Sequence, residues 1–215
     1  MSTITGLTGL TALLGSPVAH SISPLMHNEA FRLLELDYVY LCFDVNEETL
    51  PAAVAGLRTC GIRGFNLTMP NKNKIVELLD ELSPEAQLIG AVNTVLNDNG
   101  KLIGYNTDGY GFMQSVRDAG HDVTNKNITV MGVGGASMAI CAQSALDGAS
   151  SVHIFARRTS RYWNRTQKFA ENLTAKTGCQ VCLFDNDDHT ALKDSIAQSY
   201  LLINATSVGM VPDID

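Results

Sequence analysis

Residues 128–139 read Ile-Thr-Val-Met-Gly-Val-Gly-Gly-Ala-Ser-Met-Ala, and this stretch decides the fold. A short apolar run ends at Met131 and breaks into Gly132, Gly134 and Gly135, after which small residues continue at helical spacing. This order predicts a β-strand, a tight glycine turn and the start of a helix. Bare backbone N–H groups and the helix dipole at such a turn attract an anion, above all a pyrophosphate.

The segments that follow the glycine turn alternate between strand and helix patterns. Parallel strands separated by helices predict an α/β fold with a doubly wound, Rossmann-like sheet. The chain stops at Asp215, soon after the fourth expected strand, whereas a dinucleotide fold usually has further strands, so we expect this fold to be truncated at the C-terminus. The expected strands are 128–131, 151–155, 179–184 and 200–204, and the expected helices are 136–147, 161–176 and 189–197.

The first half of the chain also alternates between strand and helix patterns. Because it precedes the glycine turn, we expect it to serve a task other than nucleotide binding. Asp98-Asn99-Gly100 between two β-like runs is typical of a hairpin. Ser23 and Pro24 predict the N-cap and first position of a helix. We therefore predict an α/β substrate domain at 1–106 and a dinucleotide-binding domain at 107–215. In the first half we expect strands at 11–14, 38–45, 65–69, 91–97 and 101–105, helices at 24–36, 47–57 and 70–82, and a joining helix at 107–119.

Composition excludes several classes of protein. A net charge of −7 argues against nucleic acid as the main partner. No apolar run reaches the roughly 18 residues that a transmembrane helix needs. The N-terminus lacks the basic region of a signal peptide, and five scattered cysteines suit a reducing compartment, so we expect a cytoplasmic protein without a membrane or metal partner.

The end of the second expected strand of the nucleotide domain indicates which dinucleotide binds. NAD-binding strands end there in an acid that holds the ribose 2′-hydroxyl, but residues 155–161 read Phe-Ala-Arg-Arg-Thr-Ser-Arg. Guanidinium groups suit a 2′-phosphate instead. A solvated helix start is the alternative for these arginines, yet cations at a helix start oppose its dipole. For the glycine segment at 132–135 the alternative is a plain tight turn. The pattern favours NADP, with NAD as the alternative.

Two groups of polar residues in the first half predict acid–base chemistry. Lys72 falls in the first turn of the helix expected from Pro70, where a cation is disfavoured, which makes it a candidate proton donor or substrate clamp. If Asn97 pairs with Lys101 across the hairpin, Asn93 comes near the segment that leads to Asp108. Asn and Asp near turns are often caps, and that interpretation stays open for each of them alone.

Ser21 and Ser23 follow the first expected strand, at the edge where open α/β sheets bind ligands. The alternative to ligand binding is that Ser23 only caps the next helix. Capping explains Ser21 less well. The chain has no G-x-S-x-G sequence, which argues against a serine hydrolase.

Taken together, these motifs resemble the shikimate dehydrogenase family, including its quinate/shikimate branch. The resemblance implies reduction of 3-dehydroshikimate to shikimate by hydride transfer from NADPH, with substrate held between the two domains. It leaves open a branch that also accepts quinate and NAD, and a truncated binding protein without activity. The oligomeric state also stays open, with a homodimer as one candidate. The motifs are HSISP (20–24), NLTMPNK (66–72), GAVNT (90–94), NTDGYG (106–111), VGGAS (133–137), FARRT (155–159) and NATSVGM (204–210).

The resemblance also implies a role for each matched residue. Lys72 and Asp108 would be the catalytic pair. Ser21 and Ser23 would bind the substrate carboxylate. The remaining contacts are Thr68, Asn93 and Asp108 to the ring hydroxyls, Gly132, Gly134, Gly135 and Ala136 to the pyrophosphate, Arg157, Arg158 and Arg161 to the 2′-phosphate, and Thr206 and Met210 to the nicotinamide.

Overall fold

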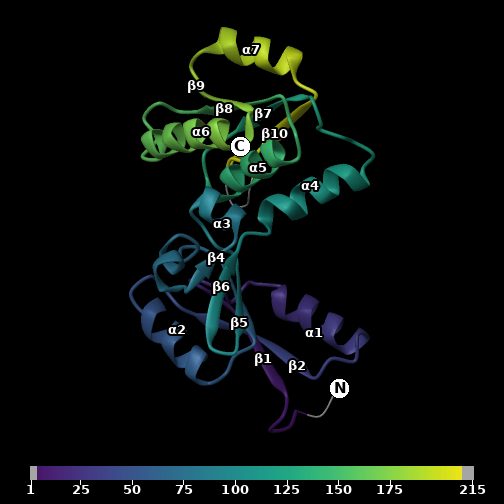
Figure 1. The fold of residues 1–215 in the computed structure, drawn as a ribbon, viewed down its shortest axis with the longest axis vertical. Helices are drawn as coiled ribbons and strands as arrows, with labels where there is room; N and C mark the ends of the chain where they lie inside the picture. Colours follow the sequence, from purple (N-terminus) through teal and green to yellow (C-terminus); the bar gives the residue numbers. More distant parts are fainter. Residues whose placement is uncertain (1–3, 210–215) are drawn as a thin grey trace. The chain divides into compact units, whose positions relative to one another are not determined.

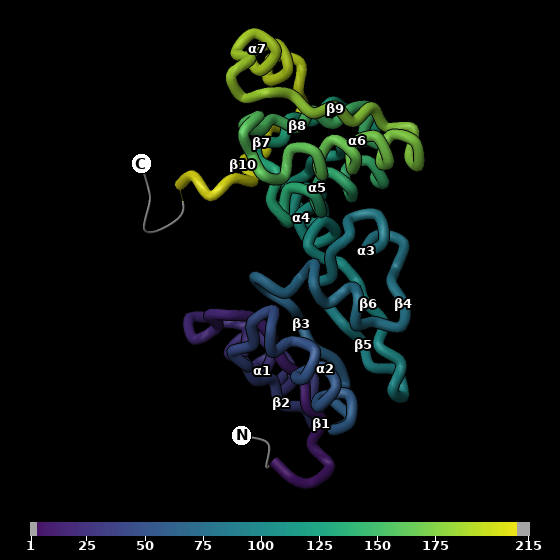
Figure 2. Tube along the Cα trace, turned by 90° about the vertical axis from the view of Figure 1, so that its left-hand side faces the viewer, coloured from purple at the N-terminus to yellow at the C-terminus, as the bar shows by residue number. Residues whose placement is uncertain are grey.

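A computed structural model of the chain describes residues 4–209. It divides into two compact units, the first extending to Asn106 and the second beginning at Thr107. Figures 1 and 2 show the elements of each unit from two directions. Within residues 4–209, no helix is both long and apolar enough to cross a membrane.

The first unit is built on a mixed sheet of six strands in the order β2-β1-β3-β5-β6-β4. Strand β1 is parallel to both β2 and β3, whereas β5 runs antiparallel to β3 and β6. The edge strand β4 is parallel to β6. The elements are β1 (Gly9–Gly15), α1 (Ser23–Leu33), β2 (Tyr38–Asp44), α2 (Leu50–Thr59), β3 (Gly64–Leu67), the 3-10 helix η1 (Lys74–Leu78), β4 (Glu81–Leu82), α3 (Pro84–Ile89), β5 (Thr94–Asp98) and β6 (Lys101–Tyr105).

The two faces of this sheet are covered by different helices. Side chains alternate along β1, so Ala12 and Leu14 join the main core with α2, while Leu13 joins a smaller core with Phe31 of α1. Figure 1 shows α1 and α2 on opposite sides of the strands. Burial of these alternating residues fixes the register of the central strand, because a one-residue slip would exchange the two faces.

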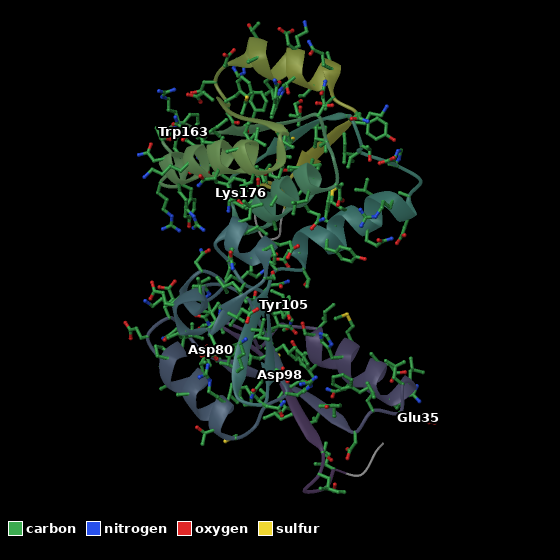
Figure 3. All side chains as sticks on the ribbon, viewed as in Figure 1. Glu35, Asp80, Asp98, Tyr105, Trp163 and Lys176 are labelled. Carbon is green, nitrogen blue, oxygen red and sulfur yellow. The ribbon has the colours of Figure 1, made fainter. Side chains whose placement is uncertain are left out.

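The expected hairpin forms, but its register differs by one residue from the expectation. Asp98, not Asn97, pairs with Lys101. The loop is therefore the two residues Asn99 and Gly100, both with positive φ (52° and 93°), as a tight hairpin turn requires. Asn97 instead accepts the Gly100 N–H on its side chain at 2.7 Å. In Figure 3 Asp98 lies at the turn end of this hairpin and Tyr105 at the other end.

Other elements of the first unit also differ from the expectation, and the expected strand 91–97 begins only at Thr94. Helix α1 ends at Leu33 rather than Leu36. Helix α2 begins at Leu50 rather than Glu47, because the side-chain oxygen of Asn46 accepts the backbone N–H of Thr49 and holds the preceding residues in a turn. The predicted helix 70–82 is wrong. A turn at 69–73, the short helix η1 and strand β4 occupy that segment, and α3 follows it.

The second unit is a sheet of four parallel strands in the order β10-β7-β8-β9. Helices α5 and α6 contact the sheet on the side where α4 packs on α5, and α7 covers the opposite side (Figure 1). This is the doubly wound, Rossmann-like arrangement expected. Strands β8 and β9 follow on one side of β7 and β10 lies on its other side, so the strand order reverses at β7. The elements are α4 (Asp108–Asp118), β7 (Asn127–Met131), α5 (Gly135–Leu146), β8 (Ser151–Ala156), α6 (Trp163–Thr177), β9 (Gln180–Asp185), α7 (His189–Gln198) and β10 (Leu201–Asn204).

Candidate functional site

A cavity of about 350 Å³ in the first unit lies at the carboxyl ends of β1 and β3. It brings together Ser21, Ser23 and Thr68, three of the residues expected to bind substrate. Gly15 makes this possible, because a β-carbon there would lie 2.2 Å from Thr68 Cγ2. The remaining lining includes Leu13, Ser16, Pro17, Val18, His20, Ile22 and Met69.

The two serines have different local roles from those expected. Ser23 is the first residue of α1 rather than its N-cap, and Ile22 occupies the N-cap position. Ser21 Oγ accepts the backbone N–H of Ser23 at 3.2 Å, so Ser21 satisfies one of the exposed donors of the helix start. The Ser23 hydroxyl lies close to the phenol of Tyr40.

Lys72 lies in the turn that precedes η1, not in the first turn of an α-helix. Its carbonyl oxygen accepts the N–H of Val92 at 2.8 Å. The N–H of Val76 donates to the carbonyl of Asn73, three residues earlier, as in a 3-10 helix. The fully buried Asn71 donates its Nδ2 to the Val45 carbonyl at 2.7 Å. The dipole of an α-helix therefore does not act on Lys72, and its turn is held by bonds to two other loops.

Asn93 is 9% exposed and immediately precedes β5. Its backbone N–H donates to the Tyr105 carbonyl at 3.0 Å, which places it beside the end of β6. Its side-chain Oδ1 accepts from Thr94 Oγ1 at 3.0 Å. Thr94 in turn accepts from Asn66 Nδ2 at 3.0 Å. Asn93 thus belongs to a polar network on one face of the sheet.

Asp108 belongs to the second unit, where it is the first residue of α4 and half-buried. A carboxylate in the first turn of a helix is stabilised by the helix dipole. Its chain neighbour Gly109 has its Cα beside the carbonyl oxygen of Ala139, so the start of α4 packs directly on α5. Asp108 is thereby placed close to the helix that begins at the glycine turn.

The glycine turn forms as expected between β7 and α5. Gly132 has φ +108°, a conformation that favours glycine, and a β-carbon there would lie 2.8 Å from the Ala205 carbonyl. A β-carbon on Gly134 or Gly135 would meet no atom within 4 Å, so open space lies over both residues. Helix α5 has no acidic residue in its first turn and no side-chain cap. These features fit a bound pyrophosphate.

Three arginines follow β8 and are exposed. In the part of the chain that the structure describes, Arg157, Arg158 and Arg161 form no ion pair with a carboxylate. Arg158 lies over the ring of Trp163 at 5.3 Å, and Arg161 lies over Tyr162 at 4.7 Å. Aromatic rings thus support two guanidinium groups, which fits an anionic ligand at this edge. Figure 3 marks Trp163 on α6.

Thr206 lies after β10 and next to the glycine turn, because its Cγ2 would be 3.1 Å from a β-carbon on Gly132. Its hydroxyl and its backbone N–H both donate to Asn204 Oδ1, at 2.6 and 3.0 Å.

Ala136, in the first turn of α5, is exposed. Met210 lies outside the described residues.

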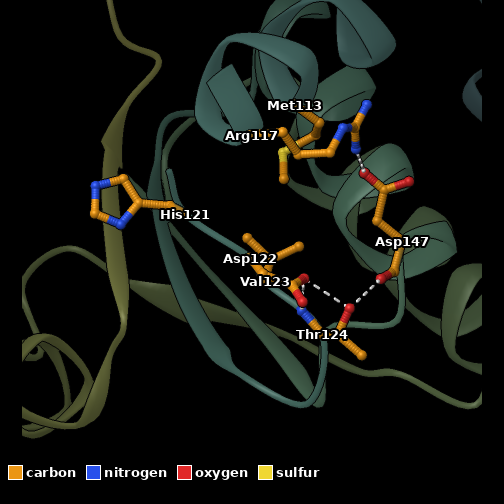
Figure 4. Close-up of a pocket in the computed structure, with 7 residues that line it drawn as sticks. All are labelled: Met113, Arg117, His121, Asp122, Val123, Thr124 and Asp147. Carbon is orange, nitrogen blue, oxygen red and sulfur yellow. Dashed lines mark hydrogen bonds and ion pairs between the residues drawn. The ribbon is translucent and has the colours of Figure 1, made fainter. Parts of the chain in front are cut away.

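A second cavity, of about 200 Å³, lies in the second unit near the end of α4 (Figure 4). Arg117 pairs with Asp147 at 2.7 Å across it. The N–H and hydroxyl of Thr124 both bond to Asp122, and the backbone bond is the main cause that lowers the pKa of that carboxyl. These groups satisfy one another, so we assign this cavity a structural role.

Sequence reasoning missed Tyr40, Asn66 and Thr94. All three contribute side-chain hydrogen bonds to the network that reaches Asn93. Their signal is a polar group at alternate positions within otherwise apolar strands, as in Phe-Asn-Leu at 65–67. Polar side chains on one face of a strand inside a sheet indicate a hydrogen-bond network on that face rather than an apolar core.

Comparison with known proteins gives consistent matches. A family profile described as the shikimate dehydrogenase substrate binding domain matches residues 13–95. Shikimate dehydrogenase (NADP(+)) of Listeria innocua is 50% identical over 209 residues, covering 97% of this chain and 72% of the relative.

Two solved structures are also similar. Shikimate 5-dehydrogenase from Listeria monocytogenes, in complex with shikimate and NAD, has a TM-score of 0.95 at 48% identity, covering 99% of this chain and 73% of that one. A shikimate dehydrogenase in complex with NADP+ has a TM-score of 0.85 at 40% identity, covering 100% and 72%.

The fold and the glycine turn define an α/β protein with a Rossmann-like unit. Identity of 50% across nearly the whole chain narrows the class further. The chain belongs to the shikimate dehydrogenase family.

Proposed function

We propose that the chain interconverts 3-dehydroshikimate and shikimate with NADP as the redox partner. One observation carries the proposal beyond family membership: Ser21, Ser23 and Thr68 converge on one cavity at the carboxyl ends of β1 and β3. Two hydroxyls beside a helix start suit a substrate carboxylate, and a third hydroxyl suits a ring oxygen. A small polar cyclic acid matches this combination.

NADPH supplies a hydride to the ketone carbon when it is bound. The oxygen of that carbon gains charge as the hydride arrives, so it needs a proton and an electrostatic partner. We assign these tasks to Lys72 and Asp108. An ammonium group can donate a proton to the oxygen, and a carboxylate can accept hydrogen bonds from the ring hydroxyls. Asn93 would hold a ring hydroxyl.

The cofactor assignment is supported by two features of the second unit. Open space over Gly134 and Gly135 suits the pyrophosphate, with Gly132 shaping the turn and Ala136 in the first turn of the helix. The three arginines, which form no ion pair with a carboxylate among residues 4–209, suit the 2′-phosphate. The contacts that we propose for the 2′-phosphate are Arg157, Arg158 and Arg161, and those for the nicotinamide are Thr206 and Met210.

NAD is the second candidate cofactor, since the Listeria monocytogenes structure holds it at 48% identity. Initial rates of NADP reduction by shikimate, with quinate and NAD in crossed assays, test both assignments. We expect turnover with shikimate and NADP. Ligand binding without turnover in any combination would instead identify a binding protein.

The 2′-phosphate contact has its own test. Replacing Arg157 and Arg158 with Gln should raise the KM for NADP by roughly tenfold or more while changing the KM for NAD little, because only NADP carries the phosphate. Lys176→Gln, in the last turn of α6, removes a cation from the helix that follows these arginines and serves as the control. Equal changes for both cofactors would refute the assignment.

A further inference from the structure

Side-chain hydrogen bonds in the first unit link residues of the three strands β2, β3 and β5 and end at Asn93. Tyr40 in β2 donates its hydroxyl to Asn66 Oδ1 at 2.8 Å. Asn66 in β3 donates its Nδ2 to Thr94 Oγ1 in β5 at 3.0 Å. Thr94 Oγ1 then donates to Asn93 Oδ1, also at 3.0 Å.

A backbone carbonyl fixes the direction of these bonds. Asn66 Nδ2 also donates to the main-chain oxygen of Asn93 at 3.2 Å. A carbonyl oxygen can only accept, so the end of Asn66 that faces it must be the NH₂ group. Thr94 Oγ1 therefore accepts from Asn66, and its single proton goes to Asn93 Oδ1. The Asn93 carboxamide is held in one orientation, with its oxygen toward Thr94.

The first member of the network is held firmly. Tyr40 is 2% exposed. The side chain of Asn28 in α1 bonds to both backbone groups of Tyr40, accepting its N–H at 2.8 Å and donating to its carbonyl at 3.0 Å. Burial raises the pKa of the Tyr40 phenol, so the phenol keeps the proton that it donates. It also lies close to Ser23, which lines the cavity at the end of β1.

We propose that Thr94, oriented by Asn66 and Tyr40, is a positioning residue that makes Asn93 present its NH₂ end to a ring oxygen of the substrate. This inference rests on the proposed function, because that function places substrate at Asn93. The substrate oxygen then acts as an acceptor. Without the Thr94 hydroxyl, the hydrogen bond that directs the carboxamide oxygen toward Thr94 is lost, and we expect the contact to that ring oxygen to weaken.

Two substitutions at one position separate the hydroxyl from packing. Thr94→Val keeps the branched shape and removes the hydroxyl, whereas Thr94→Ser keeps the hydroxyl and removes the methyl group. We expect T94V to raise the KM for shikimate about tenfold, the usual effect of losing one buried hydrogen bond, and T94S to change it less than about threefold. Tyr40→Phe should act in the same direction more weakly, and none of these variants should change the KM for NADP.

Equal losses in T94V and T94S would assign the effect to packing and overturn the inference, as would a T94V variant with a normal KM for shikimate. A second readout needs no substrate. The side-chain amide NMR signals of Asn93 in the ligand-free protein, assigned with Asn93→Asp, should move in T94V and stay near their positions in T94S. If the wild-type protein neither binds nor turns over shikimate, the proposed function fails while these shifts still report the orientation. Unmoved signals in T94V would overturn the orientation itself.

Discussion

Gly109 in α4 and Ala139 in α5 are in such close backbone contact that a β-carbon on Gly109 would lie 2.2 Å from the Ala139 carbonyl oxygen. No side-chain rotation relieves a clash between a β-carbon and a backbone oxygen, so this approach of the two helices requires glycine. Asp108 immediately precedes Gly109. The contact therefore sets the position of the proposed catalytic carboxylate relative to α5.

We predict that Gly109→Ala lowers the free energy of unfolding by about 2–3 kcal/mol, as overpacking of a tight contact does. Gly111 in the same helix has no atom within 4 Å of a β-carbon position, and Gly111→Ala is the matched control. Alanine there should be neutral or stabilise by up to ~1 kcal/mol through helix propensity. Urea unfolding of both variants measures the difference. A G109A protein as stable as G111A would show that the two helices can separate at little cost.

The two ends of the glycine turn should respond differently to alanine. Gly132→Ala forces a side chain into positive φ and 2.8 Å from the Ala205 carbonyl, so it should destabilise the fold and impair NADP binding together. Gly134→Ala meets nothing within 4 Å, so stability should stay near wild type. If the pyrophosphate lies over Gly134, the Kd for NADP should nevertheless rise about tenfold or more. Thermal unfolding and titration with NADP measure the two effects, and normal NADP affinity in G134A would place the pyrophosphate elsewhere.

The second unit could be predicted well from sequence because its signals are local. Each buried strand is a short apolar run, and the glycine turn at 132–135 needs residues that few other structures require. Parallel strands buried on both faces give continuous apolar runs, and these are easily separated from the amphipathic helices between them.

Residues 70–82 could not be predicted because tertiary hydrogen bonds override local preference there. Pro70 and the following residues suit a helix start. In the fold, however, the Lys72 carbonyl bonds to Val92 and the Asn71 side chain bonds to Val45, and both partners are distant in sequence. The hairpin register failed for a related reason, because Asn97 uses its side chain inside the turn and shifts the pairing by one residue.

In the candidate site, too, some features can be predicted from local sequence and others depend on tertiary contacts. Glycine and arginine positions can be read from local sequence, since each acts through its own backbone or charge. The orientation of Asn93 cannot, because it depends on Thr94 and on Asn66 of another strand. Only the register between β3 and β5, in which Asn66 pairs with Thr94, brings these groups together.

His153 in β8 predicts a pH dependence of stability. Burial lowers its pKa below the usual 6.5, and its ring nitrogen is hydrogen-bonded to Ser195 at 2.8 Å. Because the folded-state pKa lies below the unfolded one, the unfolded chain binds more protons in acid, and stability is lost as the pH falls below the unfolded value. We expect the free energy of unfolding to decrease as the pH falls from about 7.5 to about 5.5, and His153→Gln to weaken that decrease. His189→Gln, at an exposed position, is the control and should keep the wild-type dependence of unfolding free energy on pH. If H153Q also keeps that dependence, other groups cause it, such as His27, whose pKa is also lowered by burial.

Lys72 and Lys74 provide a matched pair for the proposed proton transfer. Lys74 is exposed and pairs with Glu77 at 2.9 Å, so Lys74→Met should change kcat by less than about twofold, as loss of a surface ion pair does little. Lys72→Met leaves the backbone bonds of its turn intact and removes only the ammonium group. We expect kcat for shikimate oxidation to fall by about a hundredfold or more, the usual effect of losing a general acid–base group. Initial rates at saturating shikimate and NADP measure this directly. A K72M enzyme with normal kcat but a raised KM for shikimate would make Lys72 a substrate clamp, and the proton would then have to pass through another group.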